Sequence, residues 1–146
     1  MKLNPSERLY VNGALIENGE RRNLLRLLMA ETELLRERDV IVDPDMSDPL
    51  IAACAIAQAA MMSRDTRGHN LERLRVHFSA LLRNPKYRES EEVVAAAQLF
   101  SCGRLSAAHH KLLRYIRRSS CEVKTVACND IATERPGDSS GQARWE

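Results

Sequence analysis

The sequence lacks the short motifs that mark common enzyme active sites. Its 146 residues contain no glycine-rich phosphate-binding loop, no nucleophile elbow and no Ser/His/Asp series. The four histidines have no acid or base partner that the sequence identifies. The four cysteines form no Cys-x-x-Cys pair, and the adjacent His109 and His110 would point to different sides of a helix. We therefore expect no enzyme activity, no cofactor and no metal site.

Long apolar runs are also absent. The longest candidate, Leu50 to Met62, is rich in alanine, contains Gln58 and is too short to cross a bilayer. Residues 1–7 lack the apolar stretch and the small-residue cleavage site of a signal peptide. Scattered cysteines are typical of thiols in a reducing compartment. These features predict a cytoplasmic protein that does not bind membranes.

The charge is nearly balanced overall but unevenly distributed. The chain has 22 basic and 20 acidic residues. Residues 1–42 carry seven of each sign, whereas residues 63–118 carry twelve basic and five acidic residues. An excess of this kind favours polyanionic partners, although a solvated arginine-rich helix face gives the same count.

Two Asn-Gly pairs dominate the amino-terminal region. Asn12-Gly13 and Asn18-Gly19 separate three short segments with β-forming residues. Because Asn and Gly tolerate the positive φ of a type I′ turn, each pair predicts a tight reversal, and together they predict a three-stranded meander. In the third segment, 22–30, alternate residues would bury one face; its leucines and arginines are also good helix formers, so a helix is the alternative. A fourth strand, or a strand and turn, is expected at 34–41.

Helical signals follow from residue 46 onward. Asp48 can cap a helix that begins with Pro49, and the helix filled by residues 50–62 should be the most buried. Three further helices are expected, from Asp65 or Thr66 to Asn84, from Ser90 to Gly103, and from Arg104 or Leu105 to Arg118.

The last of these helices carries a basic ridge opposite its apolar stripe. The ridge residues recur at spacings of seven, three and four: Arg104, Lys111, Arg114 and Arg118. This ridge is a candidate anion-facing surface, and a solvated face is the alternative. From Ser119 the sequence turns polar and too poor in apolar residues to offset the entropy of ordering, although Val123 and Val126 could pair or dock locally.

These observations predict an α+β fold. A small antiparallel sheet of three to four strands with Asn-Gly turns packs with about four helices. Residues 1–118 would form one domain, β-rich over 1–45 and helical over 46–118, followed by a disordered tail at 119–146.

The amino-terminal third also resembles a known family. The segments that carry the resemblance are Pro5-Ser6-Glu7-Arg8, Val11-Asn12-Gly13-Ala14, Ile16-Glu17-Asn18-Gly19 with Arg21-Arg22, and Leu34-Leu35-Arg36-Glu37-Arg38-Asp39-Val40-Ile41. Together they resemble FlbT, the flagellin-synthesis regulator of alphaproteobacteria, over roughly residues 1–117. The family commonly has glycine where Ser6 stands.

The resemblance implies a cytoplasmic regulator that acts after transcription. Such a protein associates with the 5′ untranslated region of flagellin mRNA, represses translation and promotes decay of the message; some relatives are described as activators. The implied partners are the flagellin mRNA leader and, further, flagellin or another flagellar regulatory protein.

An RNA ligand requires cations for phosphates and planar groups for unpaired bases. The residues that we expect to supply them are Arg21, Arg22, Arg26, Arg36, Arg38 and Tyr10, gathered along one edge of the meander. Tyr10 is the only aromatic residue of this region, so charge would supply most of the affinity. The alternative is that the interleaved glutamates and Asp39 neutralise these arginines in internal ion pairs.

A second hypothesis is a protein-binding adaptor or chaperone that holds flagellin, or another flagellar factor, against the apolar helical half. Met61, Met62 and the alanine-rich third helix would suit an adaptable groove, although plain core is the commoner role of such residues. A structural component of the flagellum ranks last.

Overall fold

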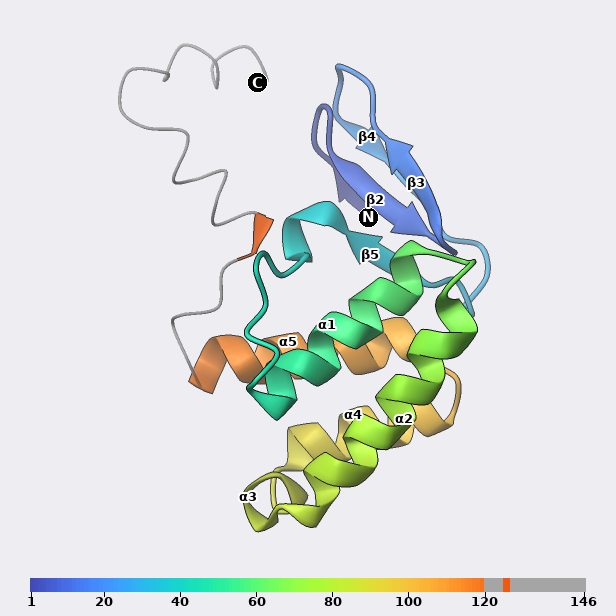
Figure 1. The fold of residues 1–146 in the computed structure, drawn as a ribbon. Coiled ribbons are helices and arrows are strands. Elements are labelled where there is room, and N and C mark those ends of the chain that lie inside the picture. The colour runs from blue at the N-terminus through green and yellow to red at the C-terminus, as the bar shows by residue number, and fades with distance from the viewer. Residues whose placement is uncertain (120–124, 127–146) are drawn as a thin grey trace, which may run out of the picture.

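The structure is a computed structural model that describes residues 1–119, 125 and 126. Short strands form one end of the molecule and helices form the other (Figure 1). This arrangement confirms the predicted α+β class. Of the predicted tail, the structure describes Ser119, Thr125 and Val126; its other residues lie outside the described part of the chain.

Five short strands form two separate antiparallel sheets. The strands are β1 (Lys2–Leu3), β2 (Arg8–Val11), β3 (Ala14–Glu17), β4 (Asn23–Leu24) and β5 (Leu34–Arg36). One sheet has the order β3-β2-β5, and the other pairs β1 with β4. A 3₁₀ turn, η1 (Glu37–Asp39), follows β5, as the expected strand and turn at 34–41 require.

The first Asn-Gly pair makes the predicted hairpin. Asn12 and Gly13 have φ values of 50° and 83°, the two positive angles that a type I′ turn needs. Val11 then faces Ala14, and Tyr10 faces Leu15, in the antiparallel register of β2 and β3.

The second Asn-Gly pair does not make a hairpin, so the predicted meander is wrong. Neither Asn18 nor Gly19 has a positive φ. The Asn18 amide Nδ2 instead donates to the carbonyl oxygens of Asn4, at 2.7 Å, and Arg21, at 2.9 Å. These bonds hold an open loop, and the chain passes into β4, which pairs with β1 from the amino terminus.

The third segment is also more exposed than predicted. Only Asn23–Leu24 is a strand, and residues 25–29 are irregular. Leu24, Leu28 and Met29 are 78%, 85% and 70% exposed. No face of the segment is buried, because the chain leaves the small sheet here on its way to β5.

Five helices follow the strands. They are α1 (Pro49–Met62), α2 (Arg67–Arg83), α3 (Pro85–Arg88), α4 (Glu91–Ser101) and α5 (Leu105–Ser119). The four long helices match the prediction. The short α3 is an addition, capped by Asn84, whose side chain accepts from the Lys86 amide.

The predicted caps explain where the long helices begin and end. The Asp48 carboxylate accepts from the amides of Leu50 at 2.9 Å and Ile51 at 3.3 Å. Ser90 caps α4 in the same way, and Gly103 follows α4 with a φ of 78°. Local sequence therefore sets the helix boundaries.

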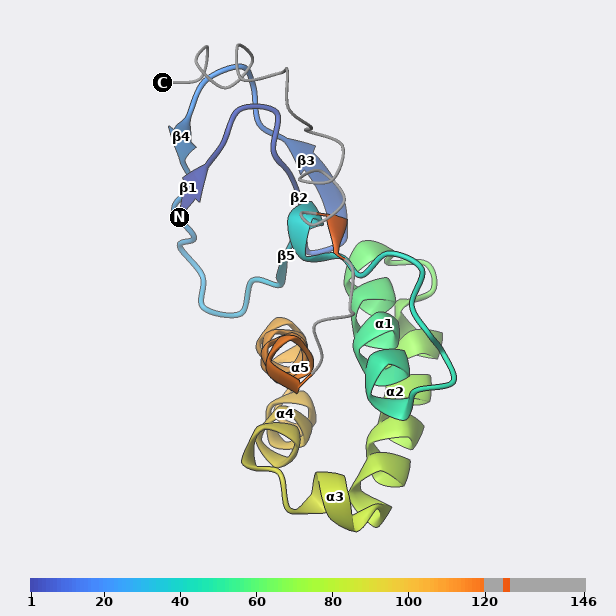
Figure 2. The ribbon, with the colours of Figure 1, turned by 90° about the vertical axis from the view of Figure 1, so that its left-hand side faces the viewer.

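Helix α1 is the centre of the core. Ten of its fourteen residues are buried, and it packs against α2 and α5. The α1–α2 pair and the α4–α5 pair lie side by side and are joined by α3 at the end farthest from the strands (Figure 2). Buried Gln58 on α1 pairs with the backbone of Ile41, which also bridges Thr125. Val126 donates its amide to Val40 at 3.0 Å, so it docks locally as expected.

Candidate nucleic-acid interface

Arg21 and Arg22 lie in the loop between β3 and β4, and both are exposed. Neither side chain forms an ion pair within the described residues. The loop backbone is nevertheless fixed, because Asn18 and Asn23 both donate side-chain hydrogen bonds to the Arg21 carbonyl oxygen. The two guanidinium groups are therefore held on an ordered loop without a carboxylate to neutralise them.

Arg26 adds a third unpaired cation just beyond β4. Its side chain is exposed and has no ion pair in the part of the chain that the structure describes. Arg21, Arg22 and Arg26 thus flank one strand, and we call them the β4 arginines. They are three of the predicted site residues that the structure leaves exposed.

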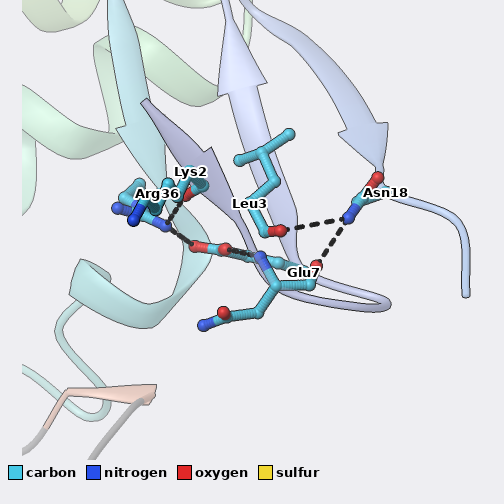
Figure 3. A network of polar contacts seen from close by, with 6 residues as sticks. Lys2, Leu3, Glu7, Asn18 and Arg36 are labelled. Atoms are coloured by element: carbon cyan, nitrogen blue, oxygen red, sulfur yellow. Dashed lines mark hydrogen bonds and ion pairs between the residues drawn. The ribbon is translucent and has the colours of Figure 1, made fainter. Parts of the chain in front are cut away.

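Arg36 is not available, contrary to the prediction. Its guanidinium contacts the Glu7 carboxylate at 2.5 Å and donates to the Lys2 carbonyl oxygen at 2.9 Å (Figure 3). The Glu7 side chain is only 8% exposed. The internal ion pair that was the alternative for this arginine is the one that forms.

The electrostatics of this pair are those of a structural contact. The hydrogen bond to Glu7 raises the pKa of Arg36. Burial alone would raise the pKa of Glu7, but hydrogen bonds from Arg36 and the Asn4 amide hold it below its usual value. Both groups therefore stay charged at neutral pH.

Arg38 and Tyr10 lie apart from the β4 arginines. Arg38 is exposed on η1, next to the three-stranded sheet, and has no ion pair among the described residues. Tyr10 is half-buried and packs against the main core. The five predicted arginines are therefore divided between two sheets, and the edge of a single meander that was to gather them does not exist.

The basic ridge on α5 is confirmed in part. Arg104 and Arg114 are exposed and Lys111 is partly exposed, and none of the three has an ion pair in the described ranges. Arg118 instead pairs with Glu92 at the start of α4. Within the described residues, the ridge therefore offers three cations without an ion pair rather than four.

Two adjoining cavities lie where the β2–β3 turn meets α2. One, of about 410 Å³, is lined by Gly13, Arg64 and Arg67 among others. The other, of about 520 Å³, shares Arg67 and reaches Arg104. Arg67 is paired with Glu33, while Arg64 donates from Nε to the Asn12 carbonyl oxygen at 2.7 Å. Sequence reasoning missed both arginines, because their partners lie 34 and 52 positions away.

A comparison with family models supports a flagellar role. The model described as "Flagellar protein FlbT" matches residues 1–122. The chain belongs to the FlbT family. This match confirms the resemblance drawn from the amino-terminal segments, and it takes in every strand and helix described above. No curated protein and no solved structure matches the chain.

Ser6 of this FlbT chain occupies a turn position that favours glycine. Ser6 has a φ of 57° in the turn that Asn4 and Glu7 close with a hydrogen bond of 3.2 Å. Pro5 precedes it, and a turn with proline at its second position and a positive φ at its third favours glycine there. In this chain the turn forms with serine at that position.

Two polar or reactive groups of this FlbT chain are buried in its core. Cys54 is fully buried and packs as a small hydrophobe, and this burial raises the pKa of its thiol to about 12. His109 is 3% exposed, and its Nε2 has no hydrogen-bond partner among the described residues. His110 is exposed, so the two histidines do face different sides of α5.

The apolar surface expected of an adaptor does not lie where it was predicted. Met61 is 1% exposed and belongs to the core, as do Val93, Ala96 and Ala97 of α4. Most of the exposed large apolar side chains occur in the strand-rich part instead, and the segment after β3 holds four of them: Leu24, Leu27, Leu28 and Met29. Within the described residues, no helix combines the length and apolarity needed to cross a membrane.

Proposed function

We propose that this protein regulates flagellin synthesis after transcription, in the cytoplasm, by binding the 5′ untranslated region of flagellin mRNA. Bound protein represses translation and promotes decay of the message. It acts by binding and catalyses no reaction. Membership of the FlbT family supports the flagellar part of this proposal. The single observation that supports the RNA part is the set of β4 arginines, exposed and without a carboxylate partner in the described residues.

These arginines suit a single-stranded RNA ligand. A guanidinium group pairs with phosphate through two parallel hydrogen bonds and can also stack on an unpaired base. Because Tyr10 packs against the core, no aromatic platform supplements them here. The affinity should therefore come mainly from phosphate neutralisation and fall as salt displaces the protein.

The test is a binding titration of purified protein with flagellin leader RNA. Substitution of all three β4 arginines by alanine should weaken binding by about tenfold or more. Each phosphate contact releases counterions from the RNA, and this favourable contribution to binding is lost with the contact. A matched control removes the same charge from exposed arginines on α2 and α3: Arg75→Ala, Arg83→Ala and Arg88→Ala. If the control weakens binding equally, the β4 arginines are not the site.

One observation favours the adaptor as a second candidate function. Leu24, Leu27, Leu28 and Met29 are exposed next to the β4 arginines, and an apolar segment in this position suits a protein partner such as flagellin or another flagellar factor. Association of purified protein with flagellin that survives ribonuclease and high salt would favour the adaptor. Retention of leader RNA by the protein alone, lost as salt rises, would favour direct RNA binding.

A further inference from the structure

Within the residues that the structure describes, no element covers the outer edge of strand β3. It lies at one side of its sheet, with β2 between it and β5 (Figure 1). All four of its residues are exposed, and Leu15 and Ile16 are 53% and 44% exposed. Both faces of β3 are therefore open to solvent, and β2 is its one strand partner among the described residues.

The outward backbone groups of this edge have no hydrogen-bond partner in the described part of the chain. The Asn18 amide donates to the Glu7 carbonyl oxygen at 2.8 Å, so residues 7 and 18 form a hydrogen-bonded pair. In an antiparallel ladder such pairs alternate, so Leu9 and Ile16 bond to each other, while Tyr10 and Leu15 do not. The amide and carbonyl groups of Leu15 and Glu17 therefore point away from β2, toward solvent.

The usual protections of an edge strand are missing from β3. Natural edges carry lysine, proline, a bulge or an inward-pointing charge that prevents pairing with another chain. The sequence Ala14-Leu15-Ile16-Glu17 has none of the first two, and its register with β2 is continuous. Its one charged side chain, Glu17, lies at the end of the strand.

We propose that β3 is a self-association edge, on which β3 of a second copy pairs antiparallel about a two-fold axis at Leu15. Leu15 then faces Leu15 of the partner subunit, and the two sheets join into one of six strands. The side-chain charges select this register: a two-fold at residue 17 sets two glutamates opposite each other, and pairing of residue 15 with residue 17 sets leucine against glutamate.

The proposed register also supplies a charge pair on each side of the axis. Glu17 pairs with Arg8 of its own chain at 3.0 Å, but both side chains are at least half exposed, so this pair is weak. Glu17 of the partner subunit falls opposite Gly13, on the same face of the sheet as Leu15. Arg64 lies against that turn, since a Cβ on Gly13 would be 2.8 Å from Arg64 Cγ. Arg64 is exposed and has no carboxylate partner within the described residues. Two-fold symmetry repeats this pair, so the interface is self-complementary.

Sedimentation equilibrium of the full chain tests the proposal. From about 1 µM to about 1 mM, the range in which small interfaces dissociate, the mass should rise from 16.5 kDa toward twice that value. Leu15→Lys should hold it at 16.5 kDa, whereas Val76→Lys, at an equally exposed valine on α2, should not. A wild-type mass that stays at 16.5 kDa throughout, or equal loss in both variants, overturns the proposal.

Charge reversal tests the register. Arg64→Glu and Glu17→Arg should each weaken the dimer at least tenfold, and the double variant should restore it to within a few-fold of wild type. Circular dichroism of each variant reports whether the monomer has kept its fold. Failure of the folded double variant to recover excludes the Leu15-centred register.

A disulfide variant locates the axis without changing charge. Hydrogen-bonded pairs in an antiparallel ladder have Cα atoms about 5.5 Å apart, within disulfide range. In a background with Cys102→Ser, Cys121→Ser and Cys128→Ser, the Leu15→Cys variant should form a covalent dimer on mild oxidation. The Val76→Cys variant in the same background should form it at least tenfold more slowly. Equal rates would contradict pairing at β3.

Discussion

The Arg36 guanidinium forms an ion pair with the Glu7 carboxylate, 29 positions away in the sequence, with Nε at 2.6 Å and Nη2 at 2.5 Å from the same oxygen. The contact ties the turn before β2 to the end of β5. It also separates the basic residues of this region into two kinds. Arg36 stabilises the fold, and the β4 arginines remain free for a ligand.

Loss of Arg36 should therefore affect stability and leave RNA binding intact. Arg36→Ala leaves the Glu7 carboxylate, which is 8% exposed, without its partner. We therefore expect the free energy of unfolding to fall by about 2–3 kcal/mol. Urea denaturation measures it. Arg75→Ala, which breaks an exposed pair with Glu72, should lower the free energy of unfolding much less, because water screens that pair. Equal costs would show that the buried carboxylate is not what matters.

The two Asn-Gly glycines should respond differently to alanine. Gly13 has a φ of 83°, and a Cβ there would meet Arg64 at 2.8 Å, so Gly13→Ala should lower the free energy of unfolding by about 1–3 kcal/mol. Gly19 has no positive φ and no heavy atom within 4 Å of an added Cβ. Gly19→Ala should leave the free energy of unfolding unchanged or raise it slightly. Thermal unfolding of both variants measures the difference. If Gly19→Ala lowered the free energy of unfolding as much as Gly13→Ala, Asn18-Gly19 would form a tight turn after all, contrary to this account.

Residue 6 offers a test of the family's turn. Because Ser6 holds a φ of 57°, Ser6→Gly should relieve left-handed strain and raise the free energy of unfolding by up to about 1 kcal/mol. Ser6→Val should lower it by about 1–2 kcal/mol, since a β-branched residue tolerates this region least. Chemical denaturation of both variants checks the order glycine, serine, valine. Any other order would contradict the turn.

The buried imidazole of His109 should make stability depend on pH. Burial, opposed by Asp39 and assisted by His110 and Arg117, lowers the pKa of His109 from 6.5 to about 4. The unfolded chain thus binds a proton at this residue below pH 6.5, while the folded chain stays neutral down to about pH 4. The free energy of unfolding should fall by about 3 kcal/mol as the pH falls through this window, and be unaffected above it.

His109→Leu separates this effect from the titration of carboxylates. The variant should lose the part of the slope between pH 6.5 and 4 that belongs to the imidazole, and keep the rest. Urea denaturation at several pH values gives both curves. Parallel curves would mean that His109 is protonated in the folded protein.

Local signals in the sequence predicted the helical half well. The helix ends are set by local signals, whose bonds and angles involve only a few neighbouring residues: Asp48 with Pro49, Ser90 and Gly103. Such signals can be recognised in the sequence without knowledge of the tertiary fold. The same holds for the turn at Asn12-Gly13, where both angles are set by the two residues themselves.

Non-local contacts explain what the sequence did not predict. β4 pairs with β1, a strand of two residues that is too short to show a pattern, and this pairing replaced the meander. Arg36 met Glu7 because β5 returns beside β2, and Arg118 met Glu92 because α5 packs on α4. The tertiary fold therefore decides which arginines form ion pairs. It also decides that the leucines after β4 are exposed.

The most direct test of the account is the salt dependence of leader RNA binding by the wild type and by the variant without the β4 arginines. On a plot of log affinity against log salt concentration, loss of three phosphate contacts to a single strand should make the slope shallower by about 2. The α2–α3 control variant should keep the wild-type slope. Equal slopes for all three proteins would contradict the claim that the β4 arginines bind the phosphates of the leader RNA.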